Sequence, residues 1–400
     1  MANVKGNKTH IDDNTKKYAL ALEGGGAKGA YHIGAVKALY ECGYNFSVIT
    51  GTSIGALNAI MIAQGDLDKA YDIWYNIKFS DIFDVEDEKI RSLMNAKISL
   101  DLVKYVSKKF TETIKSGGID TTRIRAFIDN YVDEEKLRKS DIRVGLVTLC
   151  LSDRKGKELY IEDIPKGQLV DYMMASSNLP VFKRVTINNK KYVDGGFYDD
   201  CPVHMLEKEG YKDVIAIRTF KRNRIRDYKN IVKRNNINLT VIEPVDEVTN
   251  IMNFDYKASR ELLEMGYYDT LKCIKKLDGN RYYITPKTED YFFNKIININ
   301  EKTCKKIISL LRINMNEEDN YIKVLLEDVI PELKLKLNEK MDNTYKDFVY
   351  RMVEYVALKE NVKRYKIYEF DELLKEVKSK IRIKNKNVTE QAIYSFVKGF

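Results

Sequence analysis

The sequence Phe46-Ser47-Val48-Ile49-Thr50-Gly51-Thr52-Ser53-Ile54-Gly55 joins a β-branched apolar run to an apolar helical run, Ala56 to Ala63. This pattern predicts a strand, a sharp turn and a helix, with a GxSxG pentapeptide at the turn. Its glycines let the backbone bend without Cβ clashes, and the serine between them is presented at the carboxyl end of its strand. Because Ser53 also lies at a helix N-terminus, where peptide dipoles stabilise negative charge, we predict that it is a nucleophile. The alternative is that Ser53 only caps the helix.

A second glycine-rich loop, residues 23–29 (EGGGAKG), follows a buried-strand pattern from Lys17 to Leu22 and precedes a helical pattern from Ala30 to Tyr40. Consecutive N–H groups in such a loop form an anion site at a helix N-terminus. Gly24, Gly26 and Gly29 match the GxGxxG dinucleotide fingerprint, but the acidic residue that this fingerprint needs after the next strand is replaced by residues 51–53 (GTS). The alternative is an oxyanion hole for the tetrahedral intermediate of ester cleavage.

A third signal is the run Lys191-Tyr192-Val193-Asp194-Gly195-Gly196-Phe197, in which an aspartate lies between an apolar strand and two glycines. A DG pair by itself is typical of a β-turn. A serine nucleophile needs a base, however, and the usual base is histidine. The sequence contains three histidines: His10, His32 and His204. The first lies in a polar leader and the other two occupy ordinary helix positions. If no histidine serves, a buried aspartate with a raised pKa can accept the serine proton, so a Ser53–Asp194 dyad is the simplest hypothesis.

In this order, the motifs GGGAKG (24–29), GTSIG (51–55) and DGG (194–196) resemble those of the patatin-like phospholipase family, lipid acyl hydrolases that use a Ser–Asp dyad. The resemblance spans Tyr18 to Ile284. It includes three subsidiary stretches: Ala175–Pro180, Asn253–Asp255 and Gly266–Thr270. It implies a three-layer α/β/α sandwich with a mostly parallel sheet, which agrees with the alternation of strand and helix patterns.

By this resemblance Ser53 is the nucleophile and Asp194 is the general base. The N–H groups of Gly25 and Gly26, with Gly24 adjoining, form the oxyanion hole. No cofactor and no metal is required. The residues that support these motifs are Lys28, Gly29, Gly51, Gly55, Gly195 and Gly196. Many members of the family have arginine where this chain has Lys28, which keeps the charge but loses the planar guanidinium fork.

The amino-acid composition limits where in the cell the protein is expected and which partners it is expected to bind. The 400 residues are 44% hydrophobic, carry a net charge of +9, and include five cysteines with no CxxC pair. This spacing predicts neither a disulfide framework nor a zinc site and fits a reducing cytoplasm. The charge favours an anionic surface without identifying one. No run approaches the roughly 18 apolar residues that span a bilayer. We expect a cytoplasmic protein with a glycerolipid substrate and no nucleic-acid partner; peripheral membrane contact stays an open alternative.

The chain divides by pattern into three parts: residues 1–16, a flexible leader; 17–285, a patatin-like catalytic domain; and 286–400, an all-helical region of unknown role. The stretch from Leu67 to Ile119, mainly helical in pattern, suits a lid over the site or an ordinary packing helix pair. The basic run from Arg218 to Arg234 suits a lipid headgroup contact or a solvated loop. The oligomeric state is open, and a homodimer through the C-terminal helices is one alternative.

The expected activity is hydrolysis of fatty-acyl esters in phospholipids or other glycerolipids through an acyl-enzyme, as in a phospholipase A, lysophospholipase or esterase. The alternative is a catalytically idle lipid-binding or effector module that keeps the fold.

Overall fold

The computed structural model describes residues 17–94, 117–221, 237–316, 318–337, 344–383 and 386–400. The predicted leader, residues 95–116 of the predicted lid and most of the basic run lie outside these residues. The chain forms two compact units, residues 1–270 and 271–400. The division between these units lies between residues 270 and 271, and a catalytic domain that ends at residue 285 stays a prediction.

The first unit alternates strands and helices. Its strands are β1 (Lys17–Leu22), β2 (Asn45–Thr52), β3 (Arg143–Cys150), β4 (Lys155–Tyr160), β5 (Val185–Ile187), β6 (Lys190–Asp194), β7 (Asp213–Ile217) and β8 (Asn238–Ile242). Its α-helices are α1 (Ala30–Glu41), α2 (Ile54–Ala63), α3 (Leu67–Asn76), α4 (Phe79–Ile82), α5 (Asp87–Met94), α7 (Thr122–Tyr131), α8 (Glu134–Arg138), α9 (Leu169–Ser176), α10 (Val203–Lys208) and α12 (Tyr256–Lys275), which runs into the second unit. Short 3₁₀ turns occupy Gly26–Gly29, Ile161–Asp163 and Gly195–Phe197.

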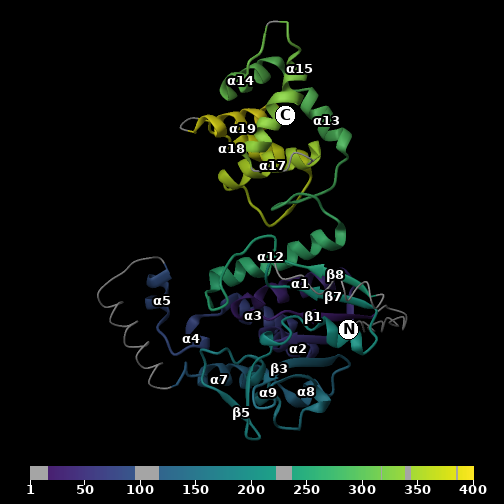
Figure 1. Ribbon diagram of the computed structural model, residues 1–400, viewed down its shortest axis with the longest axis vertical. Helices are drawn as coiled ribbons and strands as arrows, with labels where there is room; N and C mark the ends of the chain where they lie inside the picture. The colour runs from purple at the N-terminus through teal and green to yellow at the C-terminus, as the bar shows by residue number, and fades with distance from the viewer. Residues whose placement is uncertain (1–16, 95–116, 222–236, 317, 338–343, 384–385) are drawn as a thin grey trace, which may run out of the picture. The chain divides into compact units, whose positions relative to one another are not determined.

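These strands form one mixed sheet in the order β5-β6-β3-β2-β1-β7-β8, with β4 also paired to β3. The five neighbouring strands β3, β2, β1, β7 and β8 are parallel to one another. On the other side of the sheet, β4 and β6 pair antiparallel with β3, and β5 pairs antiparallel with β6. In Figure 1 the labels β8, β7, β1, β3 and β5 follow one another down the first unit in the same order. The predicted mostly parallel α/β sheet is confirmed.

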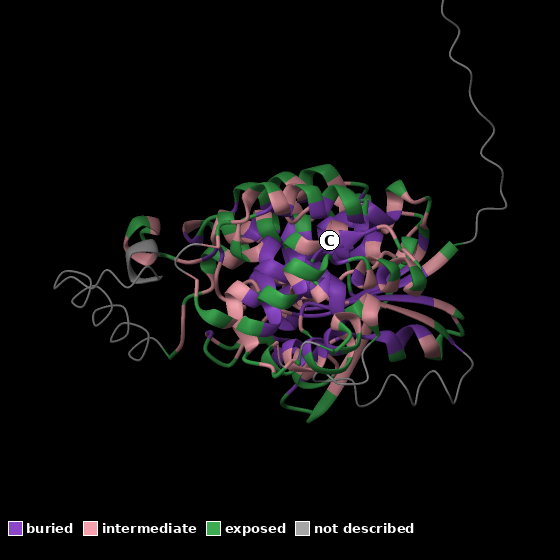
Figure 2. Cartoon of the chain, turned by 90° about the horizontal axis from the view of Figure 1, so that it is seen from above, coloured by how far each residue is buried: buried purple, intermediate pink, exposed green. Residues whose placement is uncertain are grey.

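Helices cover both faces of this sheet. One face packs on α10 through a cluster that includes Ala19 and Ala21 of β1 with Val203 and Leu206. Because side chains alternate along a strand, Leu20 and Leu22 point to the opposite face, where α2 contacts β1 and β2. Helix α9 contacts β3, and α1 contacts α2 and α3. Figure 2 shows the buried residues gathered in the interior and the exposed residues at the periphery. The result is a three-layer sandwich whose α10 layer is thin.

The second unit is helical, as predicted, except for a short parallel ladder between β9 (Tyr283–Ile284) and β10 (Ile367–Tyr368). Its helices are α13 (Glu289–Ile297), α14 (Glu301–Leu311), α15 (Tyr321–Val324), a π-helical turn at Leu325–Val329, α16 (Ile330–Lys336), α17 (Tyr345–Lys359), α18 (Phe370–Lys380) and α19 (Val388–Gly399). They enclose a separate apolar core centred on aromatic residues such as Phe292 and Phe370. Among the described residues, no helix has both the length and the apolar character needed to cross a bilayer.

Candidate active site

Strand β3 brings the ends of β2 and β6 together. Antiparallel β4 occupies one edge of β3 continuously, so β2 and β6 must share the other edge. Strand β2 ends at Thr52, which pairs with Val147, and β6 ends at Asp194, which pairs with the next residue, Thr148. Since adjacent residues along a strand are only about 3.3 Å apart, the two strand ends meet head to head. This pairing brings Ser53, the residue after Thr52, beside Asp194.

Ser53 occupies a strained turn between β2 and α2, which confirms the predicted strand, turn and helix. Its φ of 54° and ψ of −123° lie outside the regions that non-glycine residues normally adopt. The turn is tight because α2 begins directly against β1: a Cβ on Gly55 would lie 2.3 Å from the Leu22 carbonyl oxygen, and one on Gly51 would lie 2.3 Å from the Gly55 carbonyl carbon. No cap hydrogen bond is made by the Ser53 side chain, so its hydroxyl does not serve the capping role.

Asp194 is a buried carboxyl, only 4% exposed, next to this serine. Burial raises the pKa of Asp194 to about 6, and the nearby Asp200 carboxyl also acts to raise this pKa. Two contacts act in the opposite direction: the N–H of Gly196, which donates to Oδ1 over 2.8 Å, and the Ser53 side chain. Oδ2 is buried and has no hydrogen-bond partner among the described residues. Gly195 packs its Cα on the Val147 carbonyl, where a Cβ would lie at 2.2 Å.

The glycine loop lies beside the same serine, since a Cβ on Gly24 would be 3.7 Å from the Ser53 Cβ. The Gly24 N–H donates to the Asp200 carbonyl over 2.9 Å, so this amide is already occupied. The next two glycines adopt positive φ angles of 151° and 55°, and within the described chain no partner is found for the N–H groups of Gly25 and Gly26. These two amides, and not that of Gly24, are the available donors.

All of these groups open into one apolar cavity of about 420 Å³. The polar part of its lining consists of Gly24, Gly25, Gly26, Ser53, Ser177, Asp194, Gly196 and Asp200. The rest is largely aromatic and aliphatic: Ile54, Leu57, Ile82, Phe83, Ile124, Phe127, Ile128, Leu179, Phe182, Phe197, Phe220, Ile251, Met252 and Phe254. A few convergent polar groups in an otherwise apolar cavity are typical of a site for an apolar ligand with one reactive polar group.

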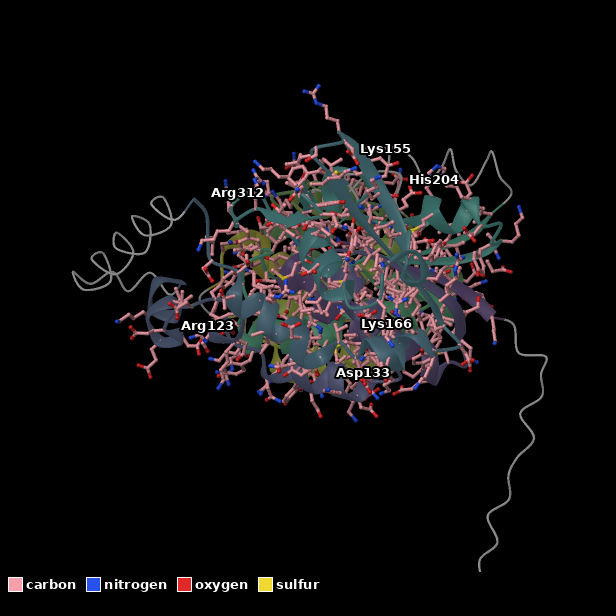
Figure 3. All side chains as sticks on the ribbon, turned by 90° about the horizontal axis from the view of Figure 1, so that it is seen from below. Arg123, Asp133, Lys155, Lys166, His204 and Arg312 are labelled. Carbon is pink, nitrogen blue, oxygen red and sulfur yellow. The ribbon has the colours of Figure 1, made fainter. Side chains whose placement is uncertain are left out.

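The two described histidines do not take part in this site. His32 is fully buried in α1, accepts a 3.2 Å hydrogen bond from the Asn58 side chain, and burial lowers its pKa to about 3. His204, labelled in Figure 3 on α10, lies with Nδ1 2.7 Å from Glu207. Neither residue lines the cavity. The helix interpretation of both residues is confirmed, and His10 lies outside the described residues.

Lys28 and Gly29 support the loop from outside the cavity lining. The Lys28 Nζ lies 3.9 Å from the ring centroid of Phe220 and 3.9 Å from Glu247, and burial lowers its pKa against the opposing effect of Glu247 and Glu23. The Gly29 carbonyl accepts a 2.9 Å hydrogen bond from Asn58. Lys28 therefore stiffens the wall that Phe220 forms and does not itself enter the cavity.

The sequence analysis did not predict the long-range hydrogen bonds that hold the site together. The carbonyl of Asp199 accepts a 2.7 Å hydrogen bond from the Thr52 hydroxyl, one residue before the carbonyl that binds Gly24. The Ser176 hydroxyl accepts from the Ser53 N–H over 2.9 Å. These bonds join segments 123 to 147 residues apart in the chain, so local spacing carries no signal for them. Within the described ranges, no group of three or more His, Cys, Asp or Glu side chains is arranged to hold a metal ion.

A serine at a sharp strand-to-helix turn, a buried carboxyl and two loop amides therefore lie together beside one cavity of a mostly parallel sheet. Comparison with known proteins gives the family. Residues 20–207 match the model of the patatin-like phospholipase family, described as "Patatin-like phospholipase". This match and the relatives described next support the patatin-like family for this part of the chain, and with it lipid hydrolysis in general terms.

Individual relatives are distant. The uncharacterized protein YqhO of Bacillus subtilis is 28% identical over 224 residues, which are 52% of this chain and 74% of that protein. The rat patatin-like phospholipase domain-containing protein 7 is 27% identical over 208 residues, 51% of this chain, but the match spans only 14% of its length. The crystal structure of VipD from Legionella pneumophila is 15% identical with a TM-score of 0.38, covering 95% of this chain and 90% of that one.

Proposed function

We propose that the protein is a serine acyl hydrolase that cleaves fatty-acyl esters of glycerolipids through an acyl-enzyme. The observation that carries this proposal is the meeting of Ser53 and Asp194 among the polar residues that line a mainly apolar cavity. In this mechanism Ser53 Oγ attacks the ester carbonyl carbon, and its proton passes to Asp194. The alcohol leaves with a proton returned by Asp194, and water then attacks the acyl-enzyme by the same route to release the fatty acid.

Asp194 suits the role of base. A carboxyl with a pKa of about 6 is a stronger base than an ordinary aspartate, yet it is mostly ionised at pH 7 and above. Because the Gly196 N–H binds Oδ1, the carboxyl is held in one orientation and Oδ2 stays available. The match to the patatin-like family, and the absence of a histidine from the cavity lining, support the assignment.

The amides of Gly25 and Gly26 are our candidates for the oxyanion hole. Gly25 is the N-cap and Gly26 the first residue of the 3₁₀ turn at residues 26–29, which leads into the N-terminus of α1, where backbone dipoles favour negative charge. They lie in the cavity lining with Ser53, so an ester carbonyl presented to the hydroxyl would also meet the loop. Loss of one such donor typically costs about 10²- to 10³-fold in kcat.

The cavity lining supports an acyl chain as the apolar part of the substrate. Side chains from seven separate segments supply it, for example Leu57, Phe127, Phe182 and Phe254. Burial of a chain against such a surface stabilises binding by about 0.8 kcal/mol for each methylene. The name of the rat relative, a phospholipase domain-containing protein, supports a phospholipid as the first substrate to test.

The direct test is incubation with phospholipid vesicles, followed by mass spectrometry of the released fatty acids and lysolipids. We expect release by the wild type and none above background by Ser53→Ala. If both proteins bind vesicles and neither releases fatty acid, the protein is an idle lipid-binding module. If Ser53→Ala releases as much as the wild type, the assignment of the nucleophile is wrong.

Membrane contact belongs to the same proposal. Two large apolar side chains beside the cavity face solvent: Phe197, which lines the cavity and is 60% exposed, and Val181, which is 52% exposed and lies between the lining residues Leu179 and Phe182. We propose that they dip into the lipid surface when the substrate enters, since apolar residues at a cavity mouth gain free energy by leaving water.

A further inference from the structure

The stretch Ser176-Ser177-Asn178, here called the bridge segment, connects the two members of the proposed dyad. Ser176 is the last residue of α9, and its hydroxyl binds the Ser53 backbone. Two residues later, the Asn178 carbonyl accepts the N–H of Asp194 over 2.9 Å. A single three-residue stretch thus bonds directly to the backbone of both Ser53 and Asp194.

Ser176 uses its hydroxyl fully. Its Oγ accepts the Ser53 N–H over 2.9 Å and donates to the Val147 carbonyl over 2.7 Å, and the residue is completely buried. Val147 is the β3 residue that pairs with Thr52, and Gly195 packs against its carbonyl. The hydroxyl therefore ties the strained turn at Ser53 to the strand whose edge also carries Asp194.

Asn178 fixes the other end of the bridge. Besides accepting the Asp194 N–H through its carbonyl, it donates from Nδ2 to the Tyr192 carbonyl over 3.0 Å and is 1% exposed. Both bonds are made to β6. The bridge segment cannot shift along β6 without breaking them, so the position of Asp194 and that of Ser176 are linked.

We propose that the bridge segment sets the distance between Ser53 and Asp194, with Ser176 as the positioning residue for the nucleophile. This inference rests on the proposed function. It also accounts for the stretch Ala175–Pro180, which the motif comparison singled out without giving it a role. Ser176 touches neither the cavity nor the reacting atoms in this proposal; it acts through the backbone of Ser53.

Removal of the Ser176 hydroxyl should affect the chemical step. Ser53 at φ 54° is held in a strained conformation by its surroundings, and one of its restraints is this hydrogen bond. Since a misplacement of about 1 Å can cost about 10²-fold in rate, we expect Ser176→Ala to lower kcat by roughly 10- to 100-fold. KM should change less than threefold, because the cavity lining is untouched.

A pH profile separates positioning from general damage. The Ser53 side chain lowers the pKa of Asp194, whereas burial and the nearby Asp200 raise it. If Ser53 moves away in Ser176→Ala, one lowering effect is lost, and the acidic limb of kcat/KM moves to higher pH. A variant that is only less stable loses activity with the limb in place.

Ser140→Ala is a matched control. The Ser140 hydroxyl makes the same pair of bonds in another part of the unit: it accepts the N–H of Ile142 over 3.0 Å and donates to the carbonyl of Ala63 over 2.6 Å. Its loss should lower the melting temperature in the manner of Ser176→Ala but leave kcat, KM and the pH limb unchanged. Ser176→Cys keeps a weak donor and acceptor of similar size and should have an intermediate kcat.

The experiment measures kcat, KM and the pH profile of hydrolysis of a monomeric ester for the wild type, Ser53→Ala, Ser176→Ala, Ser176→Cys and Ser140→Ala. The proposal is supported if kcat falls in the order wild type, Ser176→Cys, Ser176→Ala, and if the acidic limb of kcat/KM moves to higher pH only in the two Ser176 variants. Equal kcat in wild type and Ser176→Ala, or equal loss in Ser140→Ala, overturns it. If Ser176→Ala does not fold, Ser176→Cys decides by the same criteria. Activity of Ser53→Ala equal to the wild type would instead refute the proposed function.

Discussion

The Asp194 carboxyl is ionised only at a cost, because burial raises its pKa from 3.8 to about 6 and the N–H of Gly196 and the Ser53 side chain offset only part of that effect. A base must be deprotonated to accept a proton. For hydrolysis of a monomeric ester we therefore expect kcat/KM to rise with pH to a plateau, with an apparent pKa near 6. An apparent pKa near 4 for this rise in kcat/KM, or no rise between pH 5 and 8, would contradict the assignment of Asp194 as the base.

The same shift predicts a stability effect. Since the folded-state pKa is raised, the contribution of this group is fully present below the unfolded-state pKa and is lost as pH rises through about 6. Asp194→Asn cannot ionise and escapes this loss. Relative to the wild type, its free energy of unfolding should improve by roughly 1.4 kcal/mol from pH 5 to pH 8, measured by urea unfolding. The exposed carboxyl variant Asp68→Asn serves as the control and should show no comparable trend.

At this scale the sequence predicted the side chains better than the backbone contacts. Ser53 and Asp194 lie in short local motifs, and the structure places both in the lining of one cavity, while their catalytic roles stay a prediction. The Gly24 amide was expected to adjoin the oxyanion hole, but it binds the Asp200 carbonyl. That bond and the Ser176 hydrogen bond depend on which strands share an edge, which local spacing does not encode.

The elements predicted from apolar periodicity were largely found. The helix expected from Ala56 to Ala63 begins at Ile54, and the strand expected from Lys17 to Leu22 is reproduced as β1. Apolar periodicity did not predict the order of the strands in the sheet. In particular, it did not predict that β2 and β6 pair with the same edge of β3. This edge joins β2 to β6 across about 140 residues of sequence and so depends on long-range pairing.

The elbow element makes a steric prediction. A Cβ at residue 55 would lie 2.3 Å from the Leu22 carbonyl and 2.9 Å from that of Glu23, and backbone atoms cannot move aside as a side-chain tip can. Gly55→Ala should therefore destabilise the protein by at least about 2 kcal/mol and lower ester hydrolysis more than tenfold. Gly65→Asn is the control: residue 65 has a φ of 75° and open space around it, and asparagine tolerates that conformation. Wild-type behaviour of Gly55→Ala would show that α2 and β1 are not packed as described.

At the scale of the whole molecule, the chain consists of two compact units with separate cores. The helical pattern of the C-terminal region was readable from the sequence, but the division between residues 270 and 271 was not, because α12 runs through it as one periodic helix. The short β9–β10 ladder was also missed, since two-residue strands leave no alternation to detect.

The exposed apolar residues beside the cavity predict a dependence on lipid surfaces. Val181→Ser should lower hydrolysis of vesicle phospholipid roughly tenfold, the effect of losing about 1.5 kcal/mol of apolar burial, and leave hydrolysis of a monomeric ester unchanged. Val388→Ser is the control: Val388 lies in the second unit and is 51% exposed, against 52% for Val181, and its replacement should change hydrolysis of neither substrate. Equal effects of Val181→Ser on both substrates would refute surface contact by this residue.

The central claim is that Ser53 is a nucleophile activated by Asp194. The most direct measurement is the rate of covalent labelling by a fluorophosphonate at pH 8, followed by intact mass and peptide mapping of the wild type, Ser53→Ala and Asp194→Asn. We predict one adduct on Ser53, no adduct in Ser53→Ala, and labelling of Asp194→Asn slowed at least about 100-fold. An adduct at another residue, or equal labelling rates in the wild type and Asp194→Asn, would contradict the account.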